Sequence, residues 1–294
     1  MYDFDSRNLF FVNSTLLKPV VNMKQKIEAV EKLKLKSGRL PYKPDPRTFE
    51  VSAYLNKDNL PEIPAEYNWG KKIKPDNWGD MGNLKINDCT CATAGHFIMV
   101  WTSSTTKLHK PKYKDILHAY IDITGYNPKT DGEGPSVEAI KTLKYWRKNG
   151  IDGYKIIAFA KLEENNREQL KQTIYLYGGC YIGLNLPKSA EKQYNESKKW
   201  AVPRGGAKGD GEPGSLFGHA VLITGYKDDE LQIVTWGKEM IMTMDFWETY
   251  GEESYAVFSE EFIKNEKTPT GIDVDVLRND LETLQKKKAE AATK

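Results

Sequence analysis

The spacing of apolar side chains divides the chain into a helix-rich first part and a strand-rich second part. Apolar positions at helical intervals predict three helices, at Tyr113–Thr124, Ser136–Lys148 and Asn166–Tyr177. Alternating or continuous apolar runs then predict five strands, at Cys180–Leu186, Ala220–Tyr226, Leu231–Thr235, Met240–Met244 and Tyr255–Phe258. Helices followed by strands are typical of α+β proteins with two subdomains.

Another buried helix is expected to begin at Cys89, where a turn-rich loop gives way to small and then apolar residues ending near Trp101. Asp88 directly before it is a candidate N-cap. The first turn of a helix offers N–H groups without partners and the positive end of the helix dipole. Both favour the thiolate form of a cysteine, and the thiolate is the nucleophilic form. Cys89 is therefore a candidate nucleophile.

The sequence changes character outside residues 60–264, which we expect to form the compact domain. Residues 1–59 are predicted to be an N-terminal extension, with a basic amphipathic helix at Val21–Lys36 and a proline-stiffened linker at 40–47. We expect this extension to be a packing arm or a segment that binds a partner protein, and the alternative is a pro-segment that blocks the site. Residues 265–294 are predicted to be a charged tail with a helix over Val274–Lys288.

Composition excludes several classes of protein. Hydrophobic residues make up 39% and charged residues 29% of the 294 positions, as in a globular protein with a sizeable core. The net charge of +2 argues against a nucleic-acid partner. We see no membrane span or signal peptide, and three cysteines do not make a disulfide framework. A cytoplasmic or virion-associated protein that acts without a membrane is therefore expected.

Two motifs raise the question of a phosphate site or a metal site. The glycine-rich segment at 205–214 lacks the Gly-Lys-Ser/Thr ending of a phosphate loop, and we interpret it as a flexible loop before His219. Cys89, Cys91 and His96 do not have the spacing of a zinc site, and no second Cys/His pair follows. We therefore predict that the protein has no metal.

The remaining histidines and the third cysteine have simpler interpretations. His109 and His118 fall in a polar loop and on a helix face, where a structural or solvated histidine is expected. Cys180 falls in a predicted buried strand and is expected to be a small core residue. A thiol at Cys89 and an imidazole at His219, each at the start of an element, remain as a possible catalytic pair.

Five segments, in order, resemble the papain-like cysteine peptidases over roughly residues 60–263. They are Tyr67–Trp69 with Ile73–Pro75, Glu133–Ile140, Glu168–Ile182, Gly218–Val221 and Thr235–Gly237. His219 follows Cys89 by 130 residues, which fits the papain-type interval. The Asp-Cys-Thr element at 88–90 is similar to that of uncharacterised bacterial and phage-associated papain-like proteins. The resemblance implies a helical subdomain followed by an antiparallel β subdomain.

The resemblance also favours one cysteine over the other. The family carries an amide side chain six residues before the nucleophile, and this side chain donates to the oxyanion. Asn83 stands six residues before Cys89, whereas Lys85 stands six residues before Cys91 and offers no neutral amide. Cys89 is therefore preferred. Asn83 is shorter than the family's glutamine, and Thr90 replaces the tryptophan that usually follows the nucleophile.

The resemblance further implies that His219 is the catalytic base. The asparagine that orients this histidine in the family would fall near Val234–Thr235, and Thr235 is the side chain there that can form a hydrogen bond. We expect its hydroxyl to contact the imidazole. By family position, Gly132 and Gly134 are candidates to pair with the substrate backbone.

The sequence thus predicts a cysteine peptidase or amide hydrolase that acts on a peptide or protein through a thioester on Cys89, with no metal or organic cofactor. Two alternatives stay open. One is a cell-wall amidase or endopeptidase, whose Asp-Cys-Ser start is similar to residues 88–90, although such chains generally place the two residues closer together. The other is a catalytically inactive papain-like protein that serves in binding or in virion structure.

Overall fold

The computed structural model describes residues 35–53, 61–260 and 262, together with isolated positions between 275 and 290. The described residues all lie within residues 34–294, which form one compact unit. Most of the helix expected at Val21–Lys36 lies outside the described residues, and its last two positions are not helical. The described positions from Asp275 to Glu290 are helical and exposed. The predicted domain boundaries remain predictions.

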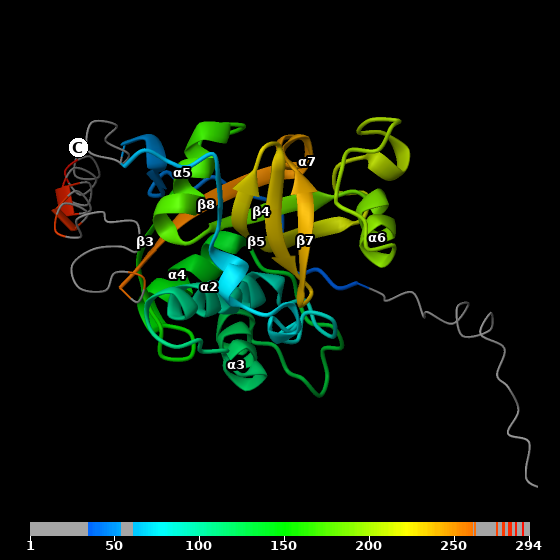
Figure 1. Ribbon diagram of the computed structural model, residues 1–294. Helices are drawn as coiled ribbons and strands as arrows, with labels where there is room; N and C mark the ends of the chain where they lie inside the picture. The colour runs from blue at the N-terminus through cyan, green and yellow to red at the C-terminus, as the bar shows by residue number, and fades with distance from the viewer. Residues whose placement is uncertain are drawn as a thin grey trace, which may run out of the picture. The chain divides into compact units, whose positions relative to one another are not determined.

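Three helices form the first half of the domain: α2 at Cys89–Thr105, α3 at Tyr113–Thr124 and α4 at Ala139–Asn149. Figure 1 shows them together on one side of the strands. α2 packs against α3, α4 and strand β5 and is buried from Cys89 to Thr102, which explains why its sequence lacks a polar face. No helix in the described part of the chain is long and apolar enough to cross a membrane.

The strands follow as one mixed sheet in the order β1-β3-β8-β4-β5-β6-β7, with β2 paired to β5. All its strand pairs are antiparallel except β1 with β3. The strands are β1 Phe49–Glu50, β2 Glu66–Asn68, β3 Ile156–Lys161, β4 Cys180–Leu186, β5 Phe217–Lys227, β6 Glu230–Thr235, β7 Lys238–Thr243 and β8 Gly251–Ser259. The predicted α+β architecture, a helical part followed by a largely antiparallel β part, is present.

Three further helices lie between strands: α5 at Arg167–Tyr177, α6 at Lys188–Asn195 and α7 at Met244–Tyr250. α5 was predicted, whereas α6 and α7 were not. Met244 was predicted to end a strand but begins α7, because the Thr243 hydroxyl accepts a hydrogen bond from the Phe246 amide and caps the helix.

Contacts between α2 and the sheet place the start of the helix beside the start of β5. The Tyr181 hydroxyl of β4 donates to the Thr90 carbonyl in the first turn of α2, at 3.0 Å. β4 and β5 pair along their length, with Leu184 opposite His219. The buried faces of these elements thus bring Cys89 and His219, far apart in sequence, to one place.

Candidate active site

Four predicted side chains lie in this region, each from a different element. Cys89 is the first residue of α2, His219 lies near the start of β5, Thr235 is the last residue of β6, and Asn83 lies in the loop before α2. All four are buried, and the most exposed retains only 2% of its accessible surface. The site is therefore closed to water in this structure.

His219 is held by the residue that the sequence predicts. Its Nε2 lies 2.8 Å from the Thr235 hydroxyl oxygen, and the Trp236 ring stacks on the imidazole at a centroid distance of 4.1 Å. Nδ1 is buried and has no hydrogen-bond partner among the described residues. Burial, and then the positive charge of Arg39, lower the pKa of His219 to about 3. The imidazole is therefore neutral.

Cys89 departs from the expectation that its helix start favours a thiolate. Burial raises the pKa of the Cys89 thiol to about 12, and the Asp88 carboxyl raises it further. The backbone N–H of Ala220 and the charge of Arg39 lower this pKa without compensating. The expectation of a thiolate is wrong for the covered site, because loss of water outweighs the helix dipole.

Asp88 occupies the N-cap position of α2 without capping it. Its side chain makes no capping hydrogen bond, and neither carboxyl oxygen has a partner of good geometry among the described residues. Burial and the nearby Asp80 raise its pKa well above the usual range, and the Asn83 amide only partly opposes them. Burial therefore disfavours the charged form of Asp88 just as it disfavours that of Cys89.

The Asn83 amide donates to two carbonyl oxygens, that of Ile86 at 3.3 Å and that of Ser37 at 3.2 Å. The first bond is local and fixes the amide in the loop. The second crosses to the N-terminal extension. A peptide carbonyl of the chain itself thus lies on the side chain that was predicted to bind the oxyanion.

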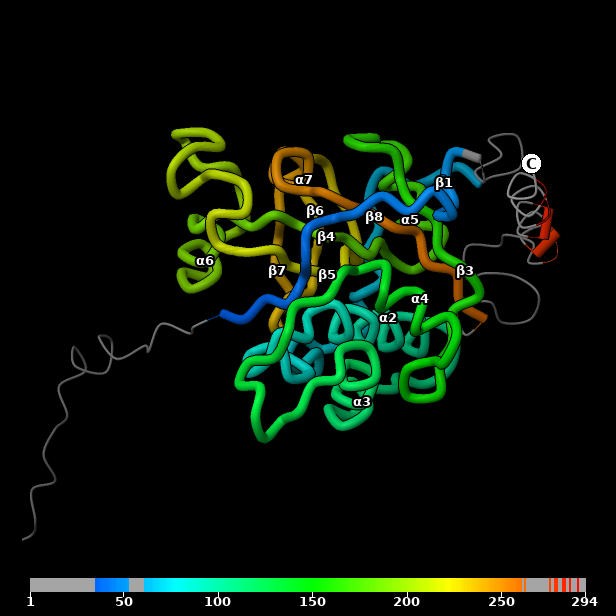
Figure 2. The backbone as a smooth tube through the Cα atoms, turned by 180° about the vertical axis from the view of Figure 1, so that it is seen from behind, coloured from blue at the N-terminus to red at the C-terminus, as the bar shows by residue number. Residues whose placement is uncertain are grey.

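Residues Leu35–Leu40, here called the strap, form hydrogen bonds across the site on the sheet side. The Trp236 indole donates to the Lys36 carbonyl at 2.7 Å, and the Ser37 hydroxyl donates to the Gly218 carbonyl. The Arg39 amide donates to the same Gly218 oxygen at 3.3 Å. Figure 2 shows the strap and the segment after it running over the strands from beside β7 to β1.

The other edge of the strap is bonded to the helical half. The Val137 amide donates to the Gly38 carbonyl at 2.5 Å, and the Leu40 amide donates to the Val137 carbonyl at 3.0 Å, as in a parallel bridge. Gly38 has φ +128°, and a Cβ there would lie 1.8 Å from the Asn87 carbonyl oxygen. The position therefore admits only glycine. Because Val137 pairs with the strap, α4 begins at Ala139, three residues later than predicted.

No protein-family model and no curated protein matches the chain. Solved structures do. Xylellain, a cysteine protease from Xylella fastidiosa, superposes with a TM-score of 0.58 at 16% identity over 76% of this chain and 96% of its own. The chain has the papain-like cysteine protease fold. ProCathepsin B S9 from Trypanosoma congolense (TM-score 0.54, 13% identity, 78% and 87% covered) and procathepsin L2 from Tenebrio molitor (0.52, 10%, 77% and 79%) agree.

The two candidate substrate glycines, Gly132 and Gly134, are not the residues that pair with the strap in this papain-like fold. Gly132 has φ +59° and open space where a side chain would lie, and Gly134 accepts a hydrogen bond from the Asn87 amide side chain at 2.7 Å. The extended backbone at Val137 pairs with the strap instead. Sequence reasoning missed Val137, and its β-branched side chain just before a helix start is the only signal.

The other cysteines and histidines of the papain-like domain have structural surroundings. Burial raises the pKa of the Cys91 thiol, and Cys180 is fully buried in β4, as predicted. His96 bonds the Gly79 carbonyl through Nε2 at 2.9 Å, and burial lowers its pKa to about 4. His109 pairs with Asp152, whereas His118 is exposed. Among the described residues no group of ligands could hold a metal ion.

Proposed function

We propose that the protein is a cysteine peptidase or amide hydrolase whose site is covered by its own strap. The observation that carries the proposal is the Ser37 carbonyl on the Asn83 amide, in the site that also holds Cys89 and His219. A peptide group already occupies the position of a bound carbonyl. Two of the similar structures, proCathepsin B S9 and procathepsin L2, are proenzymes, which supports a covered state.

The chemistry follows from the roles of these groups. Cys89 Sγ attacks the substrate carbonyl carbon while its proton passes to His219 Nδ1, and the carbonyl electrons move to the oxygen on Asn83 Nδ2. Collapse of this adduct breaks the C–N bond, and His219 gives the proton to the leaving amine. Water then hydrolyses the thioester, with His219 accepting its proton, which releases the acid and restores the thiol.

Thr235 has a positioning role in this proposal. A neutral imidazole carries one proton, and it can accept the thiol proton at Nδ1 only when its own proton is on Nε2. The Thr235 oxygen, 2.8 Å from Nε2, accepts that proton's hydrogen bond and favours the required tautomer. Thr235 thereby replaces the asparagine of the family.

Release of the strap supplies the activation step. With the strap in place, both the thiol and the imidazole are neutral because water is excluded. Access of water lowers the desolvation penalty, so the pKa of Cys89 falls and that of His219 rises, and thiolate and imidazolium stabilise each other. The pro-segment alternative for the extension is thus the one we favour, and its binding of a partner protein stays a prediction.

Intact-mass labelling with an epoxide inhibitor of cysteine peptidases tests the proposal. One adduct is expected, absent in Cys89→Ala and retained in Cys91→Ala, the matched control two residues away. Labelling that survives Cys89→Ala but disappears in Cys91→Ala would move the nucleophile. If no cysteine reacts even when the strap is displaced, the inactive binding protein is the better description. Release of fragments from peptidoglycan but not from peptides would favour the cell-wall enzyme.

A further inference from the structure

The side chain of Arg39 occupies a buried acidic pocket in the sheet half of the domain. None of its surface is accessible to solvent. One terminal nitrogen lies 2.8 Å from Glu253 Oε1, and the other lies 2.6 Å from Glu252 Oε2. The two carboxylates, neighbours on β8, thus contact opposite arms of one guanidinium group.

Neutral acceptors surround the two terminal nitrogens of this guanidinium, whereas its buried Nε has no hydrogen-bond partner among the described residues. The Asn185 side-chain oxygen and the Leu184 carbonyl, both on β4, lie 2.7 and 3.2 Å from the nitrogen that contacts Glu252. The other terminal nitrogen also donates to the Leu40 carbonyl at 3.0 Å. Several acceptors directed at a planar fork match arginine geometry, whereas an ammonium group would leave some of them unbonded.

Gly183 makes the space for this side chain. A Cβ at Gly183 would lie 2.8 Å from Arg39 Cδ and 2.7 Å from Glu253 Oε1. The backbone of Gly183 lies in an ordinary strand of the sheet, so no unusual φ requires a glycine there. The missing side chain is therefore explained by the room that the pocket needs.

Most of the pocket belongs to the sheet and stays when the strap leaves. The Tyr255 hydroxyl donates to Glu253 Oε2 at 2.8 Å and fixes that carboxyl without help from Arg39. Burial raises the pKa of Glu253, and Arg39 opposes this effect. Burial also acts on Glu252, but the charge of Arg39 and the hydrogen bond from the Tyr42 amide leave its pKa lowered. Removal of the strap's cation therefore leaves two carboxyl groups on β8 in position and without their counter-charge.

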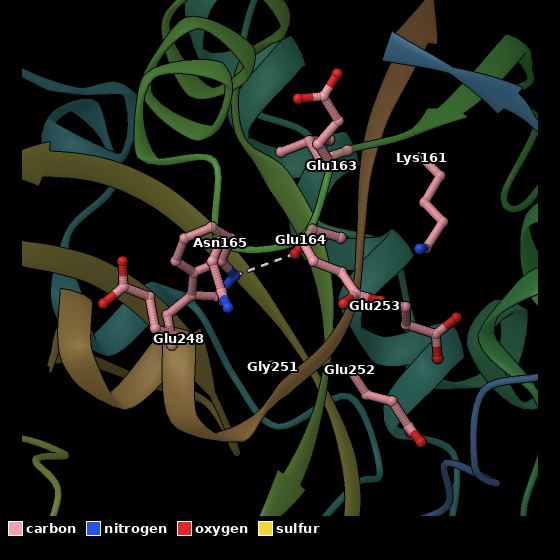
Figure 3. A pocket seen from close by; sticks show the side chains of 11 residues that line it. Lys161, Glu163, Glu164, Asn165, Glu248, Gly251, Glu252 and Glu253 are labelled. Atoms are coloured by element: carbon pink, nitrogen blue, oxygen red, sulfur yellow. Dashed lines mark hydrogen bonds between the residues drawn. The ribbon is translucent and has the colours of Figure 1, made fainter. Parts of the chain in front are cut away.

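A cavity of about 170 Å³ continues this acidic character towards solvent. Glu252 and Glu253 line it together with Glu163, Glu164 and Glu248, and the cations near these carboxyls, besides Arg39, are Lys161 in the lining and Arg167, which pairs with Glu248 at 2.6 Å. Figure 3 shows the side chains of Glu252 and Glu253 projecting from β8, with Lys161 on the neighbouring strand. A positively charged group is the ligand that such surroundings attract.

We propose that this pocket, once the strap withdraws, binds an arginine side chain of the substrate. Arg39 lies two residues from Ser37, whose carbonyl is on the Asn83 amide, so the pocket selects a basic residue two positions from the bond to be cut. That the ligand is a substrate rests on the proposed function, whereas the guanidinium pocket itself does not. Its preference for guanidinium over a neutral isostere follows from the two carboxyl groups, Glu253 buried and Glu252 partly buried.

Paired thiol-reactive peptide probes test the preference on the full, unaltered chain. The two probes are identical except for arginine or its neutral isostere citrulline two residues from the reactive carbon. The strap competes equally with both, so the ratio of their labelling rates at Cys89 reports the pocket. We expect a ratio of at least about ten, the factor that one charge-assisted hydrogen bond supplies. Glu253→Gln should abolish it, whereas Glu164→Gln, in the same cavity without an Arg39 contact, should not.

A binding measurement tests the pocket without any catalysis. In full-length Arg39→Ala/Cys89→Ala, ethylguanidinium should bind in calorimetry and ethylurea should not. If this variant folds only when ethylguanidinium is added, that rescue supports the pocket equally. Equal binding of both compounds, binding of neither to folded protein, or a probe ratio near one would overturn the proposal.

The two proposals fail in different ways. Probes that label Cys89 without regard to arginine leave the peptidase standing and remove the arginine pocket. Ethylguanidinium binding without labelling of Cys89 in any variant keeps the guanidinium pocket and removes the peptidase.

Discussion

The strap covers two groups of buried ionisable side chains and affects them in opposite ways. At Cys89 and His219 it excludes water, and the charge of its Arg39 lowers the pKa of the thiol without compensating for burial and adds to the effect of burial on the imidazole, so both stay neutral. At Glu252 and Glu253 it also excludes water but brings the guanidinium of Arg39, which opposes the effect of burial on both carboxyls. The same cation thus opposes burial by direct contact at the two carboxyls and acts on the thiol and the imidazole without contacting them through any hydrogen bond of its side chain.

This difference gives displacement of the strap two consequences. The catalytic pair gains water and with it the ability to become charged. The acidic pair loses its cation and has to be compensated by solvent or by a new cation. A basic substrate would supply the cation that Glu252 and Glu253 have lost and would react with the Cys89–His219 pair once that pair is exposed. Recognition of the substrate would thus be linked to activation.

Asn83 lies where the two regions meet, because it belongs to the loop before Cys89 and its amide donates to the Ser37 carbonyl of the strap. If the same amide binds the oxyanion, Asn83→Ala should lower turnover by about two to three orders of magnitude with little change in KM. Steady-state kinetics on a strap-displaced protein measures this. Asn77→Ala, an exposed asparagine in the same stretch, is the control. A change in KM alone would make Asn83 a substrate contact.

Displacement of the strap should convert the neutral pair into a reactive one. In Gly38→Ala the new Cβ would lie 1.8 Å from the Asn87 carbonyl oxygen, so the strap has to move. We expect the pKa of Cys89 to fall from about 12, and alkylation at pH 8 to become at least about tenfold faster.

The rate of alkylation against pH gives the inflection directly. Gly205→Ala is the matched control, because its Cβ would meet open space and its φ is ordinary. An unchanged inflection in folded Gly38→Ala would mean that something other than the strap keeps the thiol neutral.

Thr235→Val tests the orientation of the imidazole. The substitution preserves shape and leaves the buried Nε2 of His219 without a partner, which costs about 1–3 kcal/mol in comparable sites. Turnover should fall about tenfold while the circular dichroism spectrum and epoxide labelling stay largely unchanged. Thr235→Asn should restore turnover or improve it. Full turnover in the valine variant would assign Thr235 a purely structural role.

The smallest expected effect is on acid stability. The folded-state pKa values of His219 and His96 lie below the unfolded value, so their stabilising contribution is present above about pH 6.5 and is lost as pH falls towards 3. His219→Asn should take up about one proton fewer on unfolding, which reduces the slope by about 1.4 kcal/mol per pH unit. Urea titrations between pH 4 and 7 measure the slope of the free energy of unfolding against pH, and His118→Asn, at an exposed position, is the control. An unchanged slope would show that His219 is accessible to protons in the folded state.

Helices that end at a capping residue were predictable from the sequence close to their ends. Gly125 and Gly178, both left-handed, end α3 and α5 where the sequence places their ends, and the Asn166 side chain caps α5. The short strands β1 and β2 offer no periodicity to read. Their partners lie far along the chain, so their pairing is set by tertiary contacts.

Only those parts of the candidate site that follow from the spacing of residues along the chain were predictable. The interval between Cys89 and His219 and the position of Thr235 pointed to one site, and the Thr235–His219 contact is present. The ionisation of the thiol was mispredicted, because the helix dipole is local whereas burial depends on a distant segment. Arg39 and Glu253, 214 residues apart, could not have been paired from the sequence.

The pairing of β1 with β3 has a consequence for how the strap is released. Beyond the strap, the Tyr42 amide bonds Glu252, and Phe49 and Glu50 are bonded into the edge of the sheet. A cut in the chain before Arg39 would leave Arg39 tethered to the sheet as an intramolecular competitor for its own pocket. Such a tether gives a millimolar effective concentration, against which any substrate has to compete. On the proposed function, full activity would therefore require β1 to separate from the edge of the sheet, because a single cut in the strap would leave the site inhibited by its own chain.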